Sequence, residues 1–487
     1  MEQVKEKRGK KAGKTFGLGL LWSSKNIGLA VKTTLVTSYL SFYCTDVLGM
    51  GAALIGSILL GCKLFDGVTD LVAGWLIDNT RTKLGKARPY EWAILFTGIF
   101  TILLFSAPHV GAVAQAVWIA VMYIMTEAVF TTLINTSDPV YTLRAFPEEK
   151  ERSAVFSIST IFSQVISVTL GILLPTLIAN AGTSQSEWSK MALLVIGPTA
   201  LIGMTRFFFV KEKYVDDLVE KGEAVKEETP VKNETKAKKK NGVGVVEGLK
   251  AIGKNKYVLL LMVMVFAIII ASGVMNTAGT YYFKYFVGDI GKMSVVNISI
   301  VFSVLMLIIF VPLSNKFGKC RILQIGLILA TLGCIIRLVG GPNIVTLFIG
   351  MSLVMFGIMP ISVYFPLYLF DIIDYGEWKS GTRVEGMLAA LPAFATKLAN
   401  GLSVSLASLI LGAAGYDGTL ATQSESAMRA INMNYNVIPL ICMVIMTVIA
   451  LVWFNLDKIM PTVKADLAER HAATASATES AEVEEDS

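Results

Sequence analysis

Residues 62–78 read CKLFDGVTDLVAGWLID, a largely apolar segment that carries two acidic residues, Asp66 and Asp70. Most of it belongs to an apolar run, residues 52–77, that is long enough to cross a bilayer, which takes roughly 20 helical residues. Because Asp66 and Asp70 are four residues apart, both carboxylates lie on one face of that helix. A charge in hydrocarbon costs about 2.5–3.5 kcal/mol even on lenient scales, so this pair predicts a functional site inside a membrane protein.

The rest of the chain repeats this apolar pattern. Of its 487 residues, 54% are hydrophobic and only 16% are charged, too few charges to cover the surface of a soluble protein of that length. Breaks at glycine, proline and charged residues divide the chain into twelve predicted spans, at 18–46, 52–77, 90–107, 111–143, 153–180, 189–210, 257–287, 294–314, 321–340, 343–372, 385–413 and 432–455. The predicted fold class is therefore an all-α membrane protein with twelve transmembrane helices in two six-helix bundles.

A polar stretch near the middle of the chain separates the first six spans from the last six. It contains EKGEAVKEETPVKNETKAKKKN, whose low complexity and high lysine and glutamate content are typical of a solvated linker. The predicted parts are a cytoplasmic N-terminal segment (1–17), an N-terminal six-helix bundle (18–210), a cytoplasmic linker (211–256), a C-terminal six-helix bundle (257–456) and a disordered cytoplasmic tail (457–487).

Lysine and arginine indicate the orientation. They are concentrated near the N-terminus and in every second loop, for example DNTRTKLGKARP at residues 78–89, whereas the intervening loops carry few. The positive-inside rule then places both termini and the linker in the cytoplasm, as an even number of spans also requires. The first apolar run is long and lacks a small-residue cleavage site, so we expect a transmembrane helix there and not a removed signal peptide. We expect a multi-pass protein of a bacterial inner, or plasma, membrane.

The residue types exclude several functional classes. The formal net charge of +6 follows the loops and not one binding face, which argues against a nucleic-acid partner. The five cysteines show no paired spacing, and two histidines leave little for metal or acid–base chemistry. We expect no enzyme activity, no cofactor and no metal beyond a coupling cation, in a protein that works as a monomer within the lipid bilayer.

Two carboxylates on one helical face suit a monovalent cation. Like charges so close repel each other, so a proton or an inserted cation is expected to neutralise at least one of Asp66 and Asp70. Alternatively, Asp66 pairs with Lys63 and Asp70 pairs with a neighbouring helix. One salt bridge does not need two carboxylates, and this favours the cation site.

Four segments carry a family resemblance. They are FYCTDVLGM (42–50), KLFDGVTDLVAGWLIDNTRTKLGKARPY (63–90), FDIIDYGEWKSGTRVEGM (370–387) and KLANGLSVSLASLILGAAGY (397–416). With these segments the chain resembles the glycoside–pentoside–hexuronide:cation symporters, the melibiose permease family of the major facilitator superfamily, over nearly all twelve spans. The resemblance implies the major facilitator fold and transport of a sugar together with a cation.

The resemblance also implies a cation site. In that family two aspartates of the second span bind the coupling cation, and Asp66 and Asp70 occupy those positions. Thr132 matches a hydroxyl residue that helps to coordinate the cation, and Lys397 matches a lysine close to the same site. The implied coupling cation is Na⁺ or H⁺.

The implied substrate site differs from that of the galactoside carriers. Those relatives hold sugar hydroxyls with two aspartates that align here with Ala30 and Asn135. They also use an arginine and a tryptophan where this chain has Thr160 and Pro139. We therefore expect these positions to face a sugar or glycoside other than a galactoside.

Lys32 is a positive charge that the chain adds inside the first span, too deep to reach either surface easily. Facing a central cavity, it would suit an anionic substrate group such as the carboxylate of a uronide. Alternatively, it neutralises Asp66 or Asp70 across a helix interface. These two readings remain open at the level of sequence.

Three further residues are candidates for substrate binding. Asp138 lies beside a proline in the fourth span, where it contacts substrate or pairs with Lys32 or Arg144. Tyr364 and Tyr368 in the tenth span can stack on a sugar ring, although packing between helices is the commoner role of such aromatics.

Charges of complementary sign at the cytoplasmic ends suggest a gate. We expect ion pairs between the two halves when the cytoplasmic side is shut, from Asp78, Arg81, Arg88, Asp374 and Arg383. The function predicted from sequence is secondary active symport of a sugar or glycoside, acidic or neutral, by alternating access. The alternative is transport of a non-sugar solute or an amphiphile on the same fold.

Overall fold

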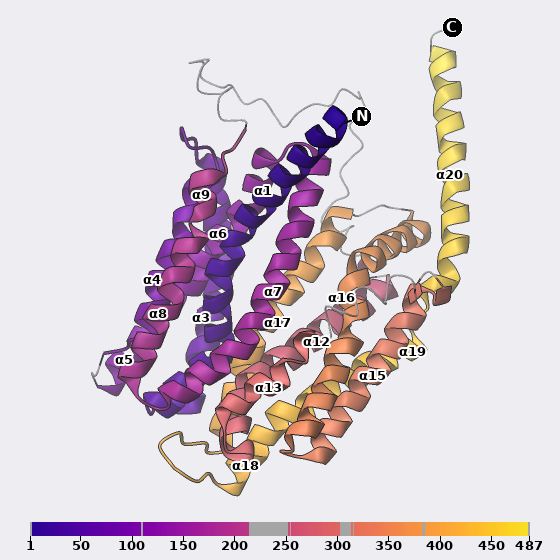
Figure 1. The fold of residues 1–487 in the computed structure, drawn as a ribbon. Helices are drawn as coiled ribbons and strands as arrows, with labels where there is room; N and C mark the ends of the chain where they lie inside the picture. The colour runs from indigo at the N-terminus through magenta and orange to yellow at the C-terminus, as the bar shows by residue number, and fades with distance from the viewer. Residues whose placement is uncertain are drawn as a thin grey trace. The chain divides into compact units, whose positions relative to one another are not determined.

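The computed structural model describes residues 2–108, 111–213, 252–253, 255–301, 313–314, 316–381 and 385–485. These residues are almost entirely helical (Figure 1). Within these ranges no β-strand occurs, and the sole extended pairing is an isolated bridge between Thr82 and Gly85. The predicted all-α class is therefore confirmed.

The chain divides into two compact units. Unit 1 contains Met1–Glu228, Gly273–Ile298 and Val404–Tyr435, and unit 2 contains Thr229–Ser272, Ser299–Ser403 and Asn436–Ser487. Three helical elements contribute residues to both units, namely α12 (Lys256–Tyr282), α17 (Glu385–Ala413) and η7 (Met433–Val437).

The remaining elements each belong to one unit. Unit 1 holds α1 (Glu2–Thr34), η1 (Leu35–Tyr39), α2 (Leu40–Phe42), η2 (Tyr43–Val47), α3 (Ala52–Asn79), η3 (Arg88–Glu91), α4 (Trp92–Leu104), α5 (Ala112–Tyr123), η4 (Ile124–Thr131), α6 (Thr132–Ala145), α7 (Glu149–Ala181), α8 (Gln185–Gly203), α9 (Thr205–Phe209), η5 (Phe283–Val287), η6 (Ile290–Lys292), α13 (Met293–Asn297) and α18 (Glu425–Asn432). Unit 2 holds α15 (Lys319–Gly340), α16 (Ile344–Ser380), α19 (Ile438–Val452) and α20 (Leu456–Glu485).

The helices reproduce the predicted spans. In the described part of the chain, 9 helices are long and apolar enough to cross a membrane, and each corresponds to a predicted span. The span predicted at 18–46 is helical throughout, and that at 90–107 consists mainly of η3 and α4. The span predicted at 294–314 lies partly outside the described residues.

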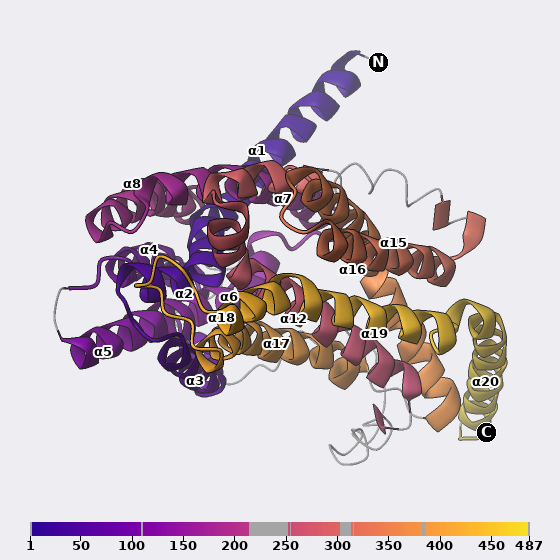
Figure 2. The same cartoon turned by 90° about the horizontal axis from the view of Figure 1, so that it is seen from below.

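Glycines set how closely the helices pack within each unit. A Cβ atom on Gly28 of α1 would lie 3.1 Å from the Cα of Gly203 on α8. A Cβ on Gly357 of α16 would lie 2.2 Å from the carbonyl oxygen of Gly326 on α15, and Figures 1 and 2 both show these two helices side by side. Small residues at such crossings let backbones approach and are the usual basis of helix association in membranes.

Wide π-helical turns interrupt several spans of unit 1. η2 contains Asp46, η4 contains Glu127 and η5 contains Lys284. Such turns often occur at functional sites, because the extra residue redirects side chains and leaves backbone groups less regularly bonded. The three charged side chains on these turns are therefore candidates for functional residues.

The C-terminal tail differs from its prediction. Residues 457–487 were expected to be disordered, whereas α20 extends to Glu485. An apolar stripe at helical spacing explains its first turns, since Leu456, Met460, Val463 and Leu467 are all buried. The prediction of disorder followed the polar composition of the last residues and did not take these four apolar positions into account. The predicted linker 211–256 falls largely outside the described residues.

Candidate functional site

A largely buried charge cluster in unit 1 includes Asp66 of the predicted cation site. Asp66 on α3 forms an ion pair with Lys63, whose Nζ lies 3.0 Å from Asp66 Oδ2. The same Nζ lies 3.9 Å from Oε2 of Glu127 on η4 and sits over the ring of Tyr123, 5.6 Å from its centre. The Lys63–Asp66 pair considered from sequence is therefore present, and a third carboxylate lies next to it.

Lys32 belongs to the same cluster. Its Nζ lies 2.7 Å from Glu127 Oε1 and donates a hydrogen bond to Thr131 Oγ1 at 2.9 Å. The side chain of Lys32 is only 2% exposed. Of its two predicted roles, neutralisation of a carboxylate is the one that the contacts match, but the carboxylate is Glu127 and not Asp66 or Asp70. We refer to Lys32, Lys63, Asp66 and Glu127 as the charge cluster.

Asp66 keeps one carboxylate oxygen unused. Its Oδ1 is buried and has no hydrogen-bond partner among the described residues. Thr132, which is buried at the start of α6, directs its hydroxyl to the carbonyl oxygen of Glu127 at 3.5 Å. Asp70 follows Asp66 by one turn of α3 and is half-buried. A buried carboxylate oxygen without a partner is costly, and a bound cation removes that cost.

Lys397, the fourth predicted cation-binding residue, lies on α17 in unit 2. Its side chain is exposed. Its part in the cation site stays a prediction.

The predicted substrate residues of unit 1 fall in different environments. Ala30 is half-buried on α1, and Asn135 is exposed on α6. Thr160 is exposed on α7 and donates its hydroxyl to the carbonyl oxygen of Phe156 at 2.9 Å, one turn earlier in its own helix.

The ion-pair partners of Asp138 are not the two that the sequence predicted. It pairs with Lys25 at 2.8 Å and with Arg206 at 2.8 Å, and not with Lys32 or Arg144. Arg206 is fully buried and also pairs with Glu91. Both oxygens of Asp138 are thus held by cations of unit 1, and its contact with a substrate stays a prediction.

Aromatic rings pack against Arg206, the residue that pairs with Asp138 and Glu91. The Arg206 guanidinium lies 4.2 Å from the ring centre of Trp22 and 5.0 Å from that of Tyr141. A planar guanidinium can stack on rings while its edge bonds to carboxylates. Sequence reasoning missed Arg206 and Glu91, although both are charges inside predicted spans and so met the criterion that identified Asp66.

Asn26 is another polar residue that sequence reasoning missed. On α1, one turn before Ala30, its amide nitrogen donates to Ser163 Oγ at 2.6 Å and lies 3.5 Å from Ser159 Oγ. The two serines lie on α7, so polar side chains link α1 to α7 within unit 1. The signal of this link in the sequence is the spacing of Ser159 and Ser163 by four residues.

The predicted aromatic residues lie on α16 in unit 2. Tyr368 is fully buried and donates its hydroxyl to the carbonyl oxygen of Lys319 at 2.9 Å. Tyr364 lines a cavity of about 760 Å³ whose wall also includes Asp371, and Lys319 and Lys464 both pair with Asp371. The hydroxyl of Tyr368 is thus bonded inside unit 2, and stacking of Tyr364 or Tyr368 on a sugar stays a prediction.

The predicted gating residues begin with a turn between α3 and η3. Asp78 pairs with Lys86 at 3.0 Å, Arg81 is exposed, and Arg88 donates to the carbonyl oxygen of Phe207 at 2.8 Å. Asp374 lies on α16, and Arg383 falls outside the described residues.

Glu212 holds this turn in place. Its carboxylate accepts hydrogen bonds from the backbone nitrogens of Lys86, Ala87 and Arg88 at 3.0, 2.8 and 2.7 Å. Bonds from backbone N–H groups to a carboxylate are among the stronger ones in proteins. Sequence reasoning assigned Glu212 to the linker and so missed this role.

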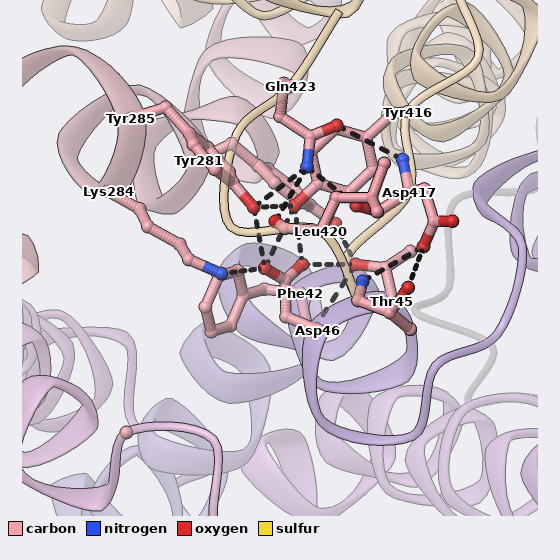
Figure 3. Close-up of polar contacts among 12 residues, drawn as sticks. Phe42, Thr45, Asp46, Tyr281, Lys284, Tyr285, Tyr416, Asp417, Leu420 and Gln423 are labelled. Carbon is pink, nitrogen blue, oxygen red and sulfur yellow. Dashed lines mark hydrogen bonds and ion pairs between the residues drawn. The ribbon is translucent and has the colours of Figure 1, made fainter.

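A second set of charges lies around Asp46 on η2 and was not predicted as a site. Figure 3 shows the Asp46 carboxylate between Lys284 of η5 and Thr45, with Tyr416 beside it. The Tyr416 hydroxyl lies 2.9 Å from Oδ1 and 2.8 Å from Oδ2, and Thr45 Oγ1 donates to Oδ2 at 2.8 Å. We call Thr45, Asp46, Lys284 and Tyr416 the clasp.

The clasp joins parts of unit 1 that are far apart in sequence. The Tyr285 hydroxyl lies 3.2 Å from that of Tyr416 and accepts from Gln423 at 3.2 Å. Next to it, Thr419 donates from its hydroxyl and its backbone to Asp417, and these bonds lower the pKa of the exposed Asp417 carboxyl. Together with the bonds from Lys284, Tyr416 and Thr45 described above, both carboxylate oxygens of Asp46 have hydrogen-bond partners.

Four residues before Thr45, a pair of hydroxyl groups links α2 to α17. Ser41 Oγ lies 2.7 Å from Ser408 Oγ, and both serines are buried. The clasp residues and this pair connect segments from the two halves of the sequence by polar contacts within unit 1.

Comparison with known proteins assigns the family. Residues 22–458 match the family described as MFS/sugar transport protein. An isoprimeverose transporter of Lactiplantibacillus pentosus is 29% identical over 459 residues, covering 93% of this chain and 91% of the relative. A glucuronide carrier protein homolog of Escherichia coli (strain K12) is 22% identical over 430 residues, covering 85% of this chain and 87% of the relative.

Comparison with solved structures identifies the fold. A solved D-xylose-proton symporter aligns with a TM-score of 0.56 at 14% identity, covering 88% of this chain and 97% of that one. Together these similarities confirm the resemblance read from the sequence and the major facilitator fold. The chain therefore belongs to the MFS/sugar transport protein family of glycoside:cation symporters, and it is a multi-pass membrane transporter and not an enzyme.

Proposed function

We propose that this protein carries a sugar or glycoside across the membrane by symport with one monovalent cation, and that Asp66 and Asp70 bind the cation. The observation that carries the proposal is the buried Oδ1 of Asp66, which has no partner among the described residues. Thr132 supports the site in this proposal, and the part of Lys397 stays a prediction. Na⁺ and H⁺ both remain candidates, since carboxylate oxygens suit either cation.

The energetics of such a cycle are sufficient for accumulation. One charge that crosses 100 mV contributes about 2.3 kcal/mol. At about 1.36 kcal/mol per factor of ten, this corresponds to roughly fifty-fold accumulation of a neutral sugar. A monoanionic substrate would cancel the charge and would depend on the cation gradient alone.

We propose a neutral glycoside as the substrate. The sequence suggested an acidic substrate because of Lys32, but the Lys32 ammonium is held by Glu127 and Thr131. A uronide carboxylate would have to displace a carboxylate 2.7 Å away. The isoprimeverose named for one relative is therefore a better first probe than the glucuronide named for the other.

We propose that transport proceeds by alternating access, with the predicted bundles at 18–210 and 257–456 rocking about the site. In this proposal the clasp shuts the extracellular side, and the basic turn held by Glu212 belongs to the cytoplasmic side, with both termini. Polar and ionic contacts suit a gate, because water can replace each of them when the gate opens.

The test is uptake by purified protein in proteoliposomes. Isoprimeverose and a glucuronide are offered under a sodium gradient or a proton gradient, with and without an imposed membrane potential. A neutral substrate with one cation gives an inward positive current, whereas a monoanionic substrate gives none. The substrate class and the cation are read from the same measurements.

Asp70→Asn should abolish gradient-driven accumulation and leave exchange of substrate across the membrane. Glu187→Gln is the matched control, because Glu187 is an exposed carboxylate whose ion-pair partner among the described residues is Lys190 of its own helix. Accumulation by Asp70→Asn at the wild-type level would refute the coupling role.

A further inference from the structure

We propose that Lys63 is a tethered cation that occupies the coupling site when no ion is bound, and that Glu127 accepts Lys63 when the ion arrives. This inference rests on the proposed function, in which Asp66 binds the coupling cation. It assigns a role in coupling to two residues outside the predicted cation site.

Lys63 lies between two carboxylates. Its Nζ is 3.0 Å from Asp66 Oδ2 and 3.9 Å from Glu127 Oε2. The first distance is a hydrogen-bonded ion pair, and the second is an ion pair without a hydrogen bond. A lysine side chain has four rotatable bonds, so a small rotation exchanges one partner for the other.

Such an exchange is required when a cation binds Asp66. An ammonium and a monovalent ion carry the same charge, and they would compete for the same buried carboxylate. The unused Oδ1 gives the ion a place to enter, while Lys63 still holds Oδ2. Repulsion between the two cations then drives Lys63 away from Asp66.

Glu127 is prepared to receive it. Lys32 fixes Glu127 Oε1 at 2.7 Å and also donates to Thr131, which lies on the same π-helical segment. The other oxygen, Oε2, has Lys63 at 3.9 Å as its described ion-pair partner. Glu127 is thus held firmly by one oxygen and can accept Lys63 with the other.

The charge count agrees with one cation per cycle. With side chains in their ordinary ionised forms, the positive groups are Lys32 and Lys63, and the negative groups are Asp66, Asp70 and Glu127. The four residues of the charge cluster are balanced, Asp70 one turn further on α3 adds one negative charge, and one monovalent cation brings these five residues to zero. A neutral loaded state is the one best suited to move through a low-dielectric region.

Ion binding can be measured without knowing the substrate. The melting temperature of the purified protein in detergent is followed against NaCl, with choline chloride at constant ionic strength, and against pH in the absence of sodium. An ion that binds only the folded protein raises the melting temperature, and the half-saturating concentration follows from the titration. The sodium and proton arms distinguish the two cations.

Glu127→Gln should raise the half-saturating concentration at least tenfold, because Lys63 then has no other acceptor. Lys63→Gln should lower it at least fivefold, because the internal competitor is gone. The double variant Lys63→Gln/Glu127→Gln should behave like Lys63→Gln alone, since Glu127 acts only through Lys63. A plain electrostatic field would instead make the two changes cancel, and that result overturns the proposal.

A control covers the buried Lys32, which loses its partner in Glu127→Gln. The variant Lys32→Met/Glu127→Gln removes a neutral pair and leaves no uncompensated charge. It should still bind the ion at least tenfold more weakly than wild type. Recovery of the wild-type value in this variant would show that Glu127 acts through Lys32 and would refute the exchange.

Failure of the inference differs from failure of the proposed function. If wild type shows no ion-dependent stabilisation and Asp70→Asn accumulates substrate, the coupling role of the aspartates is refuted. If wild type responds to the ion, Asp70→Asn does not, and Glu127→Gln matches wild type, only the exchange is refuted.

Discussion

The charge cluster and the clasp both pair a carboxylate with a lysine inside predicted spans, yet the two carboxylates differ in how completely they are bonded. Asp46 has both oxygens bonded, by Lys284, Tyr416 and Thr45. Asp66 has one oxygen bonded by Lys63 and one that is buried without a partner among the described residues.

This difference indicates different functions. A fully bonded carboxylate gains nothing from a further ligand and serves to hold segments together. An incompletely bonded, buried carboxylate is stabilised by a cation that can reach it. The clasp therefore fits a gate that is either made or broken, and the charge cluster fits a site that exchanges partners.

The largest expected effect comes from a substitution in the charge cluster that leaves the clasp unchanged. Asp66→Asn should abolish ion-induced stabilisation altogether, because the amide offers no negative charge to a cation. The reactivity of Cys44, which is buried beside the clasp, should stay at the wild-type level. Both are measured on the same preparation, by thermal titration and by maleimide labelling with the other four cysteines changed to alanine. Ion-dependent stabilisation that persists in this variant would contradict the assignment of the cation to Asp66.

The reverse pattern is expected for Asp46→Asn. Loss of the charge leaves Lys284 without its carboxylate, and the clasp should open more often. We expect labelling of Cys44 by a membrane-impermeant maleimide to rise about tenfold, or roughly 1.4 kcal/mol in the opening equilibrium. The half-saturating ion concentration should not change. Unchanged labelling would show that the clasp is not a gate.

A smaller effect of the same kind is expected for Tyr416→Phe. This change removes only a hydroxyl, and a typical hydrogen bond contributes about 0.5–1.5 kcal/mol. Labelling of Cys44 should therefore rise about threefold to tenfold, and by no more than it rises in Asp46→Asn. A larger rise than in Asp46→Asn would show that Tyr416, and not the ion pair, keeps the clasp closed.

The smallest effect is expected at Thr160. Its hydroxyl already bonds to the carbonyl oxygen of Phe156 in its own helix, so Thr160→Val removes no contact between helices. Uptake of isoprimeverose should stay within about twofold of wild type when initial rates are compared, since surface changes away from special features usually cost under about 0.5 kcal/mol. A loss greater than tenfold would support the predicted place of Thr160 in the substrate site.

Sequence reasoning located the charges better than their partners. The rule that an intramembrane charge marks a functional site identified Asp66, Asp70, Lys32 and Asp138. The same rule, applied to every predicted span, would also have found Asp46, Glu127, Lys284 and Arg206. Of these four charges only Asp46 lies in a segment that carries the family resemblance, and the resemblance assigned it no role.

The Lys63–Asp66 pair, within one helix turn, was among the pairings considered from the sequence, whereas the partners from distant segments could not be read from it. Lys32 and Glu127 are separated by 95 positions, and Asp46 and Lys284 by 238. Many lysines and carboxylates lie at comparable separations, and only helix packing selects among them. The sequence offered Asp66 or Asp70 for Lys32 and offered Lys32 or Arg144 for Asp138, and all of these pairings differ from those in the structure.

What the sequence by itself determined is the transmembrane architecture. Span length, the scarcity of charges and the basic loops follow from the cost of placing each residue in hydrocarbon or water, which is a local property of the chain. The tertiary structure alone decided which charges meet, which carboxylate oxygen stays unbonded, and that the tail begins as a packed helix. The physical reason is that pairing and burial depend on residues brought together from distant segments, whereas membrane insertion depends on each segment separately.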